Sequence, residues 1–318
     1  MSEQQSNGAP AVEGLSERTR AKWAAASTPE KIAANLPPML DLTIENITEN
    51  VMKINSMCDN PRLRYLILKL IQAAHDYVRE VGLQFDEWEQ AWEFLTKVGQ
   101  ISTDVRHEFV LLSDILGISA LVDAISYPAV PGATESSVLG PFHDEEAHSF
   151  QYGESIFTEG TPGEPTIVRG WIKDTDGNTV PKALIDVWET DGNGVYDLEH
   201  DGNADPNCRG KIFSNEKGEG PLPLPHMHFM IEHPKYTKLI TALYSRDSNF
   251  VESDTVFGVK KSLIVGYKWC EDLELAKEHT VTPIVKTIDG KESTGFWLLE
   301  QDFVLVKKSP PPPRKTED

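Results

Sequence analysis

Two histidines separated by one residue stand out in the stretch PHMHFMIEHP. His226 and His228 lie in an apolar run, and residues two positions apart on a β-strand point to the same face with their Cα atoms about 7 Å apart. Two imidazoles on one face can bind a single metal ion. Histidines at this spacing also arise by chance on packed strands, so the pair indicates a metal site only together with further donors.

Tyr196 is the candidate for a third donor. It follows the strand-and-turn sequence ALIDVWETDGNGVYD, and a tyrosine at such a place is usually a half-buried packing residue. As a phenolate it is a hard, strongly donating oxygen, which favours a trivalent ion such as Fe(III) over Zn(II). One tyrosine with two histidines therefore points to iron rather than to a zinc hydrolase.

Charge and composition narrow the class of protein. The chain has 318 residues, with 30 Lys and Arg against 50 Asp and Glu and a formal net charge of −20, which repels nucleic acids and anionic membranes. Its three cysteines, Cys58, Cys208 and Cys270, are widely spaced, as in a reducing compartment rather than a disulfide framework. The polar N-terminus lacks a signal-peptide core, and no run approaches the length of a membrane span. We expect a cytoplasmic protein with no nucleic-acid or membrane partner.

Residues 41–128 have the periodicity of helices. In NPRLRYLILKLIQAAHDYVREVG, Asn60 is a predicted N-cap, Pro61 suits the first helical position, and Gly82 ends an apolar stripe of helical spacing. A second helix is predicted in FDEWEQAWEFLTKVG and a third in TDVRHEFVLLSDILGISALVDAI. The apolar face of the third is broader than one neighbouring element needs, which indicates contact with another subunit or with an apolar ligand.

The composition changes after Pro128. Short β-branched runs then alternate with Asp-Gly and Asn-Gly turns, a pattern typical of an antiparallel sandwich or barrel. His143 and His148 lie among acidic residues in FHDEEAHSF, and we interpret this segment as an exposed acidic loop rather than a second metal site.

Several long motifs together resemble the intradiol ring-cleaving dioxygenases, above all the intracellular catechol and hydroxyquinol 1,2-dioxygenases. The similar segments occur in the family's order and cover most of the chain: ESSVLGPFH, VRGWIKDTDGNTVPKALIDVWETDGNGVYD, CRGKIFSNEKGE and PHMHFMIEHPKYTKLITALYSRDSNFVESDTVFGVKKSLIV. The first of these tilts the resemblance toward the hydroxyquinol branch.

The resemblance implies an α+β fold, with a helical dimerisation segment followed by an antiparallel β-sandwich catalytic domain. We predict a mostly irregular N-terminus over residues 1–40, the helical domain over 41–128, and the catalytic domain over 129–308, shortened near 219–223. Residues 309–318, which contain four consecutive prolines, are predicted to form a disordered tail. A homodimer, with a lipid at its interface, is part of the same implication.

The resemblance also implies the site and its chemistry. By position, Tyr196, His226 and His228 match ligands of a high-spin Fe(III) ion. Arg209 matches a catalytic arginine that lines or supports the site, with a surface ion pair as the alternative. The residues implied near the substrate are Gly140, Pro141 and Phe142. The implied reaction is cleavage of a catechol or hydroxyquinol by O2 between its hydroxyl-bearing carbons, which gives a muconate or a maleylacetate-type product in aromatic catabolism.

The chain departs from the family pattern just before the His-x-His strand. Where the family has Gly-x-Tyr, with the second tyrosine ligand, this chain has Gly218, Glu219 and Gly220, and the family's arginine position is Pro223. The flanks match up to this junction, which indicates loss of one contiguous coding segment, as in a skipped or mispredicted exon. A divergent member is the alternative. Metal affinity and rate are expected to fall.

Three interpretations stay open at this stage: an active dioxygenase, a catalytically impaired family member that keeps the fold and dimer, and a zinc or copper protein that uses the histidine pair alone. A substitute tyrosine would reach the metal only in a rearranged fold. The candidates are Tyr152, Tyr236, Tyr244 and Tyr267.

Overall fold

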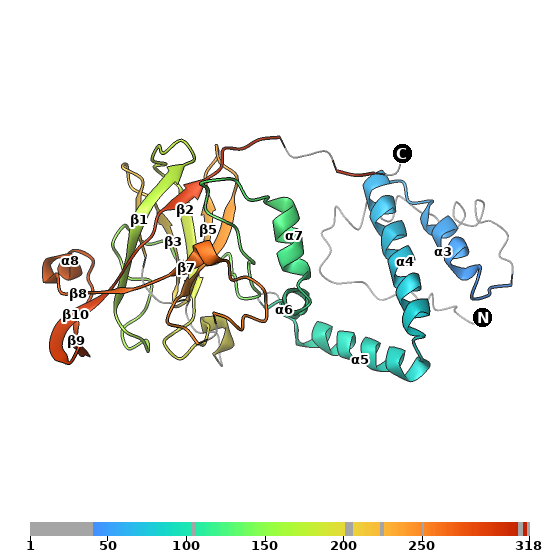
Figure 1. Cartoon of the computed structure of the whole chain (residues 1–318), viewed down its shortest axis with the longest axis horizontal. Coiled ribbons are helices and arrows are strands. Elements are labelled where there is room, and N and C mark those ends of the chain that lie inside the picture. Colours follow the sequence, from blue (N-terminus) through green and yellow to red (C-terminus); the bar gives the residue numbers. More distant parts are fainter. Residues whose placement is uncertain are drawn as a thin grey trace, which may run out of the picture. The chain divides into compact units, whose positions relative to one another are not determined.

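The computed structural model describes residues 41–103, 106–200, 206–222, 226–249, 251–310 and 314–316. The chain divides into two compact units, Met1–Ala91 with Pro311–Asp318 and Trp92–Pro310 (Figure 1). The predicted irregular N-terminus lies outside the described residues, as does part of the predicted tail.

Five helices are described before the first strand: α3 (Ile47–Asn55), α4 (Pro61–Val81), α5 (Phe85–Ile101), α6 (Glu108–Ile115) and α7 (Ile118–Ser126). The limits of α4 are the predicted ones, because the side chain of Asn60 accepts a hydrogen bond from the amide of Leu63 at 3.0 Å and Gly82 adopts a left-handed conformation, with φ of 61°. Among the described residues the first strand begins at Thr166. The last helix before the strands ends at Ser126, close to the change in composition after Pro128, whereas the compact units divide earlier, within α5.

The prediction of one continuous third helix is wrong. Gly117 has φ of 69°, a left-handed conformation that favours glycine, and it separates α6 from α7, which are bent by 85°. Among the described residues no single helix is long and apolar enough to cross a membrane; the bent pair passes that test by length and composition alone.

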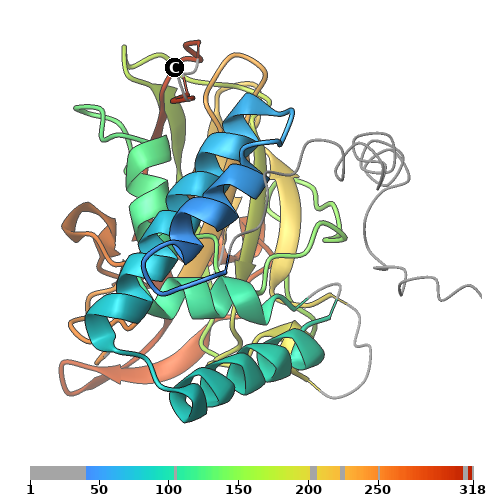
Figure 2. The same cartoon turned by 90° about the vertical axis from the view of Figure 1, so that its right-hand side faces the viewer.

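In the first unit α3 lies beside α4 (Figure 2). Arg79 of α4 donates to the hydroxyl group of Thr48 at 2.6 Å, and the same hydroxyl lies 2.9 Å from Nδ1 of His75. These polar contacts fix the pair, while much of the apolar surface of α4 stays exposed.

The rest of the fold consists of strands, with α8 (Leu273–Glu278) and two short 3-10 turns (Asp197–Glu199 and Lys261–Leu263) between them. The strands are β1 (Thr166–Asp174), β2 (Leu184–Glu189), β3 (Arg209–Phe213), β4 (Glu219–Leu222), β5 (His226–Glu232), β6 (Leu239–Ser245), β7 (Ile264–Val265), β8 (Lys268–Cys270), β9 (Ile284–Ile288), β10 (Lys291–Glu300) and β11 (Phe303–Leu305).

These strands form two sheets. One has the order β11-β1-β10-β8, with β4 on β1 and β9 on β10, and the other has the order β3-β2-β5-β6-β7. Ile172 and Leu299 of the first sheet share a buried core with Ile185 and Phe229 of the second. The predicted α+β fold is confirmed, but the sheets are mixed rather than purely antiparallel, since β1 pairs in parallel with β10 and β11, and β6 with β7.

Strand alternation decides where the histidine pair lies. Met227, Phe229 and Ile231 of β5 are fully buried in the core between the sheets. Since successive residues of a strand point to opposite faces, the positions of His226 and His228 fall on the other face of the sheet.

Gly170 marks the place where β1 changes its partner. β1 pairs with β10 up to Arg169 and with β11 from Ile172 onward, so the chain between those two partners crosses β1 in close contact. A Cβ atom at Gly170 would lie 1.8 Å from the carbonyl oxygen of Gln301. Only glycine allows this approach.

We expect Gly170→Ala to lower the free energy of unfolding by about 3 kcal/mol, because backbone must move to admit the methyl group. Urea denaturation measures the change. The matched control is Gly266→Ala, whose Cβ would meet only the Arg246 guanidinium at 3.5 Å and which should change the free energy by less than about 0.5 kcal/mol. Equal effects of the two variants would contradict the proposed crossing.

Candidate active site

His228 lies against Trp188, its cross-strand partner on β2. The two rings are stacked, with centroids 5.3 Å apart and planes 8° from parallel, and His228 is 7% exposed. Gly140 closes the other approach, since a Cβ there would lie 3.7 Å from Cε1 of His228. The side chain of His226 lies outside the described residues.

Tyr196 comes to the same place from the loop after β2. Its ring stacks on Phe142, with centroids 4.6 Å apart, and lies 6.4 Å from the ring of His228. Burial raises the pKa of the Tyr196 phenol well above its ordinary value, and the negative charge of Glu199 adds to the shift. A phenolate here therefore needs a nearby cation, and a metal ion bound beside His228 would supply one.

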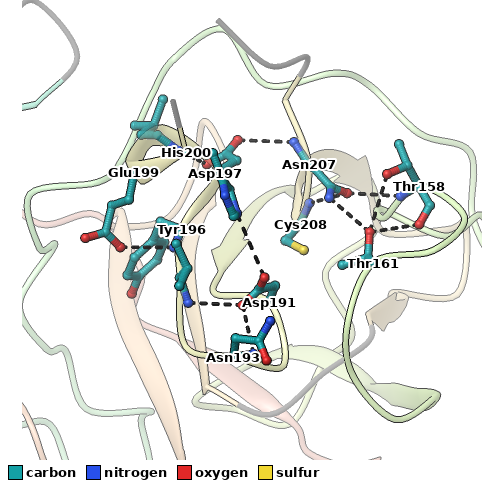
Figure 3. Close-up of polar contacts among 12 residues, drawn as sticks. Thr158, Thr161, Asp191, Asn193, Tyr196, Asp197, Glu199, His200, Asn207 and Cys208 are labelled. Carbon is teal, nitrogen blue, oxygen red and sulfur yellow. Dashed lines mark hydrogen bonds and ion pairs between the residues drawn. The ribbon is translucent and has the colours of Figure 1, made fainter. Parts of the chain in front are cut away.

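The loop that carries Tyr196 is fixed by its own carboxylates (Figure 3). Asp191 accepts hydrogen bonds from the amides of Asn193 at 2.8 Å and Val195 at 3.1 Å, and Glu199 accepts one from the amide of Tyr196 at 3.0 Å. These short-range bonds explain why the DGNGVYD sequence forms a defined turn rather than an extended linker.

Arg209 ties this loop to the segment that covers the site. It is 2% exposed, donates from Nε to Oδ2 of Asp197 at 2.6 Å, makes a second contact from Nη2 to Oδ1, and donates from Nη1 to the carbonyl oxygen of Phe142 at 3.2 Å. The alternative of a surface ion pair is therefore wrong. Of the two roles predicted for Arg209, lining the site or supporting it, the geometry favours support of the site.

The structure thus brings together most of the predicted site residues. Gly140 and Phe142 lie against His228 and Tyr196, and Pro141 stands between them in the chain. The guanidinium of Arg106, from the loop before α6, lies 5.8 Å from the centre of the Phe142 ring. The substrate role of this segment stays a prediction.

The interpretation of FHDEEAHSF as an exposed loop holds for Glu145, Glu146 and His148, which are exposed, but is wrong for His143. Its side chain is only 12% exposed, its Nε2 lies 3.2 Å from Oδ2 of Asp186 on β2, and its ring meets Trp188 edge-on at 4.6 Å. The sequence carries no signal for this contact, because it joins residues 43 positions apart. His143 therefore supports the indole on which His228 rests.

The departure from the family pattern falls in β4. Gly218 belongs to a turn, with φ of 85°, and Glu219 pairs with Trp171 of β1, while Pro223 lies outside the described residues. Of the tyrosines named as substitutes, Tyr244 is the cross-strand partner of His226, and its hydroxyl group lies 3.1 Å from Oγ of Ser137.

Two protein-family models match the chain. One, described as "Catechol dioxygenase N terminus", matches residues 60–134, and the other, described as "Dioxygenase", matches residues 138–222. The second match ends at the last residue of β4.

Relatives align over most of the chain. An intradiol ring-cleavage dioxygenase of Aspergillus niger is 44% identical, with 87% of this chain and 88% of that protein covered, and a hydroxyquinol 1,2-dioxygenase of a Rhizobium species is 35% identical, with 83% and 95% covered. The solved structure of a hydroxyquinol 1,2-dioxygenase from Pseudomonas putida has a TM-score of 0.68 at 32% identity and covers 83% of this chain and 99% of that one.

The lengths of these alignments show that this chain lacks residues that both relatives have. The alignment with the Aspergillus protein runs over 311 residues, whereas 87% of 318 residues is about 277. The alignment with the Rhizobium protein runs over 292 residues, whereas 83% is about 264. Each relative therefore has residues at about 30 positions where this chain has gaps.

We expect Arg209→Met to lower the free energy of unfolding by about 3–5 kcal/mol, since it leaves the Asp197 carboxylate buried without its cation. Urea denaturation measures the loss. The double variant Arg209→Met with Asp197→Leu removes both charges and should recover part of it. If the double variant is no more stable than the single one, the ion pair does not hold this loop.

Proposed function

Because this chain belongs to the intradiol ring-cleavage dioxygenases, a family whose members use non-haem iron, we propose that it cleaves an aromatic diol with O2 between the two hydroxyl-bearing carbons. The observation that carries the proposal is the convergence of a buried tyrosine and a histidine: Tyr196 and His228 lie with their ring centroids 6.4 Å apart, between Phe142 and Trp188.

The proposed metal ligands are Tyr196, His226 and His228, and the proposed ion is Fe(III). The donor set fits this ion, since burial opposes ionisation of the Tyr196 phenol and a trivalent cation would stabilise the phenolate. When bound, Fe(III) supplies a Lewis acid and electron acceptor toward the diol. Trp188 orients the imidazole of His228 by stacking, and Phe142 covers the ring of Tyr196 and limits access of water.

We propose hydroxyquinol rather than catechol as the substrate, with a maleylacetate-type product. The support is that relatives at 35% sequence identity and a solved structure at 32% carry the name hydroxyquinol 1,2-dioxygenase, together with the ESSVLGPFH motif. The absent second tyrosine removes one anionic donor, so we propose a slower turnover than in relatives that have it.

Ferric iron added to the purified protein should give a red to purple colour, because tyrosinate bound to Fe(III) absorbs in the visible, and the hue should change on addition of hydroxyquinol. Tyr196→Phe should abolish the colour. Visible absorption spectra, iron content and oxygen consumption with hydroxyquinol or catechol measure these outcomes.

Tyr236→Phe is the control, since the Tyr236 hydroxyl group donates to Asp174 at 3.3 Å, among the charged residues near Lys307; it should keep the colour. A colourless protein that carries zinc would contradict the dioxygenase proposal. A coloured protein inert toward both diols would favour the impaired family member.

We also propose a homodimer formed through the apolar surface of α4, with a lipid as a further occupant of that surface. The exposed apolar side chains of this helix are Leu63, Leu66, Leu70, Tyr77, Val78 and Val81. So many large apolar groups on one helix are typical of a surface covered by a partner. We propose a cytoplasmic location, in line with three free cysteines among the described residues.

Leu70→Glu should shift the protein from dimer to monomer, because it places a charge in the proposed interface, and sedimentation velocity measures the mass. Leu70 is 63% exposed in the single chain, so its replacement should leave the fold intact. Lys69→Glu, at an exposed neighbouring position on α4, should leave the dimer unchanged. A mass that Leu70→Glu does not alter would count against this interface.

A further inference from the structure

Glu189, the last residue of β2, carries a buried carboxyl group. It is 1% exposed, and among the described residues neither of its carboxyl oxygens has a hydrogen-bond partner. Burial raises its pKa well above the ordinary value. Buried polar groups are nearly always hydrogen-bonded in folded proteins, so this carboxyl group requires an explanation.

Tyr267 presents a second buried polar atom of the same kind. Its ring packs against the core between the sheets, and its hydroxyl oxygen is buried with no hydrogen-bond partner in the described part of the chain. Tyr267 follows β7 by two residues, and β7 runs parallel to β6, with Val265 beside Ser245, while the preceding Tyr244 lies opposite His226 at the start of β5. Tyr267 and Glu189 therefore lie toward the same end of the second sheet.

The position of Glu189 coincides with the junction found in the sequence. Its cross-strand partner is Met227, one residue after β5 begins. The preceding strand, β4, ends at Leu222 and belongs to the other sheet. The carboxyl group therefore lies at the end of the sandwich where the chain passes from one sheet to the other, with only residues 223–225 between the two strands.

Each of the two relatives has residues at about 30 positions where this chain has gaps, and the match to the family model ends at Leu222. Both observations favour a gap between β4 and β5. A segment of this size, inserted at that point, would begin and end beside Glu189.

We infer that Glu189 and Tyr267 are the contact site of a segment of about 30 residues. The relatives carry this segment between these strands, and this chain lacks it. Donor groups of that segment would bond to the Glu189 carboxyl and an acceptor or donor would meet the Tyr267 hydroxyl. In the described part of this chain both groups have no such bonds. The inference deepens the proposed function, since the same segment would complete the active site.

The test compares this chain with an extended form in which the corresponding segment of the Aspergillus relative replaces residues 223–225. In this chain Glu189→Met, which keeps the length of the side chain but removes its polar atoms, should raise the thermal midpoint by about 2–4 °C. In the extended form the same change should lower the midpoint by a similar amount, because it breaks bonds that the segment makes. Tyr267→Phe should show the same change of sign.

Asp114→Leu is the matched control. Asp114 is another buried carboxyl group, 1% exposed on α6, and its replacement should shift the midpoint equally in both forms. A Glu189→Met change of the same sign and size in both forms would overturn the inference. A fall in this chain alone would overturn it too, even if the extended form does not fold. The readout is the stability of metal-free protein, so a failure of the iron or activity tests leaves its outcome unaffected.

Discussion

The pairing of β2 with β5 is the constraint on which the candidate site depends. Trp188 and His228 are opposite each other in this ladder, so register places the two rings side by side on one face, where they stack. Met227 and Phe229 are buried on the opposite face, and a slip of one residue would exchange the two faces and send the histidines into the core. Burial of the apolar face therefore fixes the position of the histidine pair.

The buried pair of Arg209 and Asp197 extends that constraint to Tyr196, which no sheet holds. Two desolvated charges contribute little net stability, because the cost of leaving water offsets most of their attraction. Their value lies in geometry: one guanidinium bonds both the loop that follows Tyr196 and the carbonyl oxygen of Phe142. The tyrosine and the ring stacked on it are thus fixed relative to the same strand, β3.

The two sheets also explain how the fold accommodates the short connection between β4 and β5. β4 keeps its partner β1, and β5 is paired on both sides, with β2 and with β6. Neither strand depends on the connection for its hydrogen bonds. The consequence appears instead in side chains, since Glu189 and Tyr267 retain buried polar atoms without partners among the described residues.

Local sequence determined the limits of α4, through the Asn60 cap and Gly82, and placed the histidine pair on one face of a strand. It also indicated the end of this helical region near Ser126 and the departure before His226. Only the tertiary structure decided the break at Gly117, the parallel strand pairs, the burial of Arg209 and the contact of His143 with Asp186. Helix caps and strand alternation act between near neighbours in the chain and are visible in its letters, whereas these other features arise from backbone conformation and contacts set by the packing of distant segments.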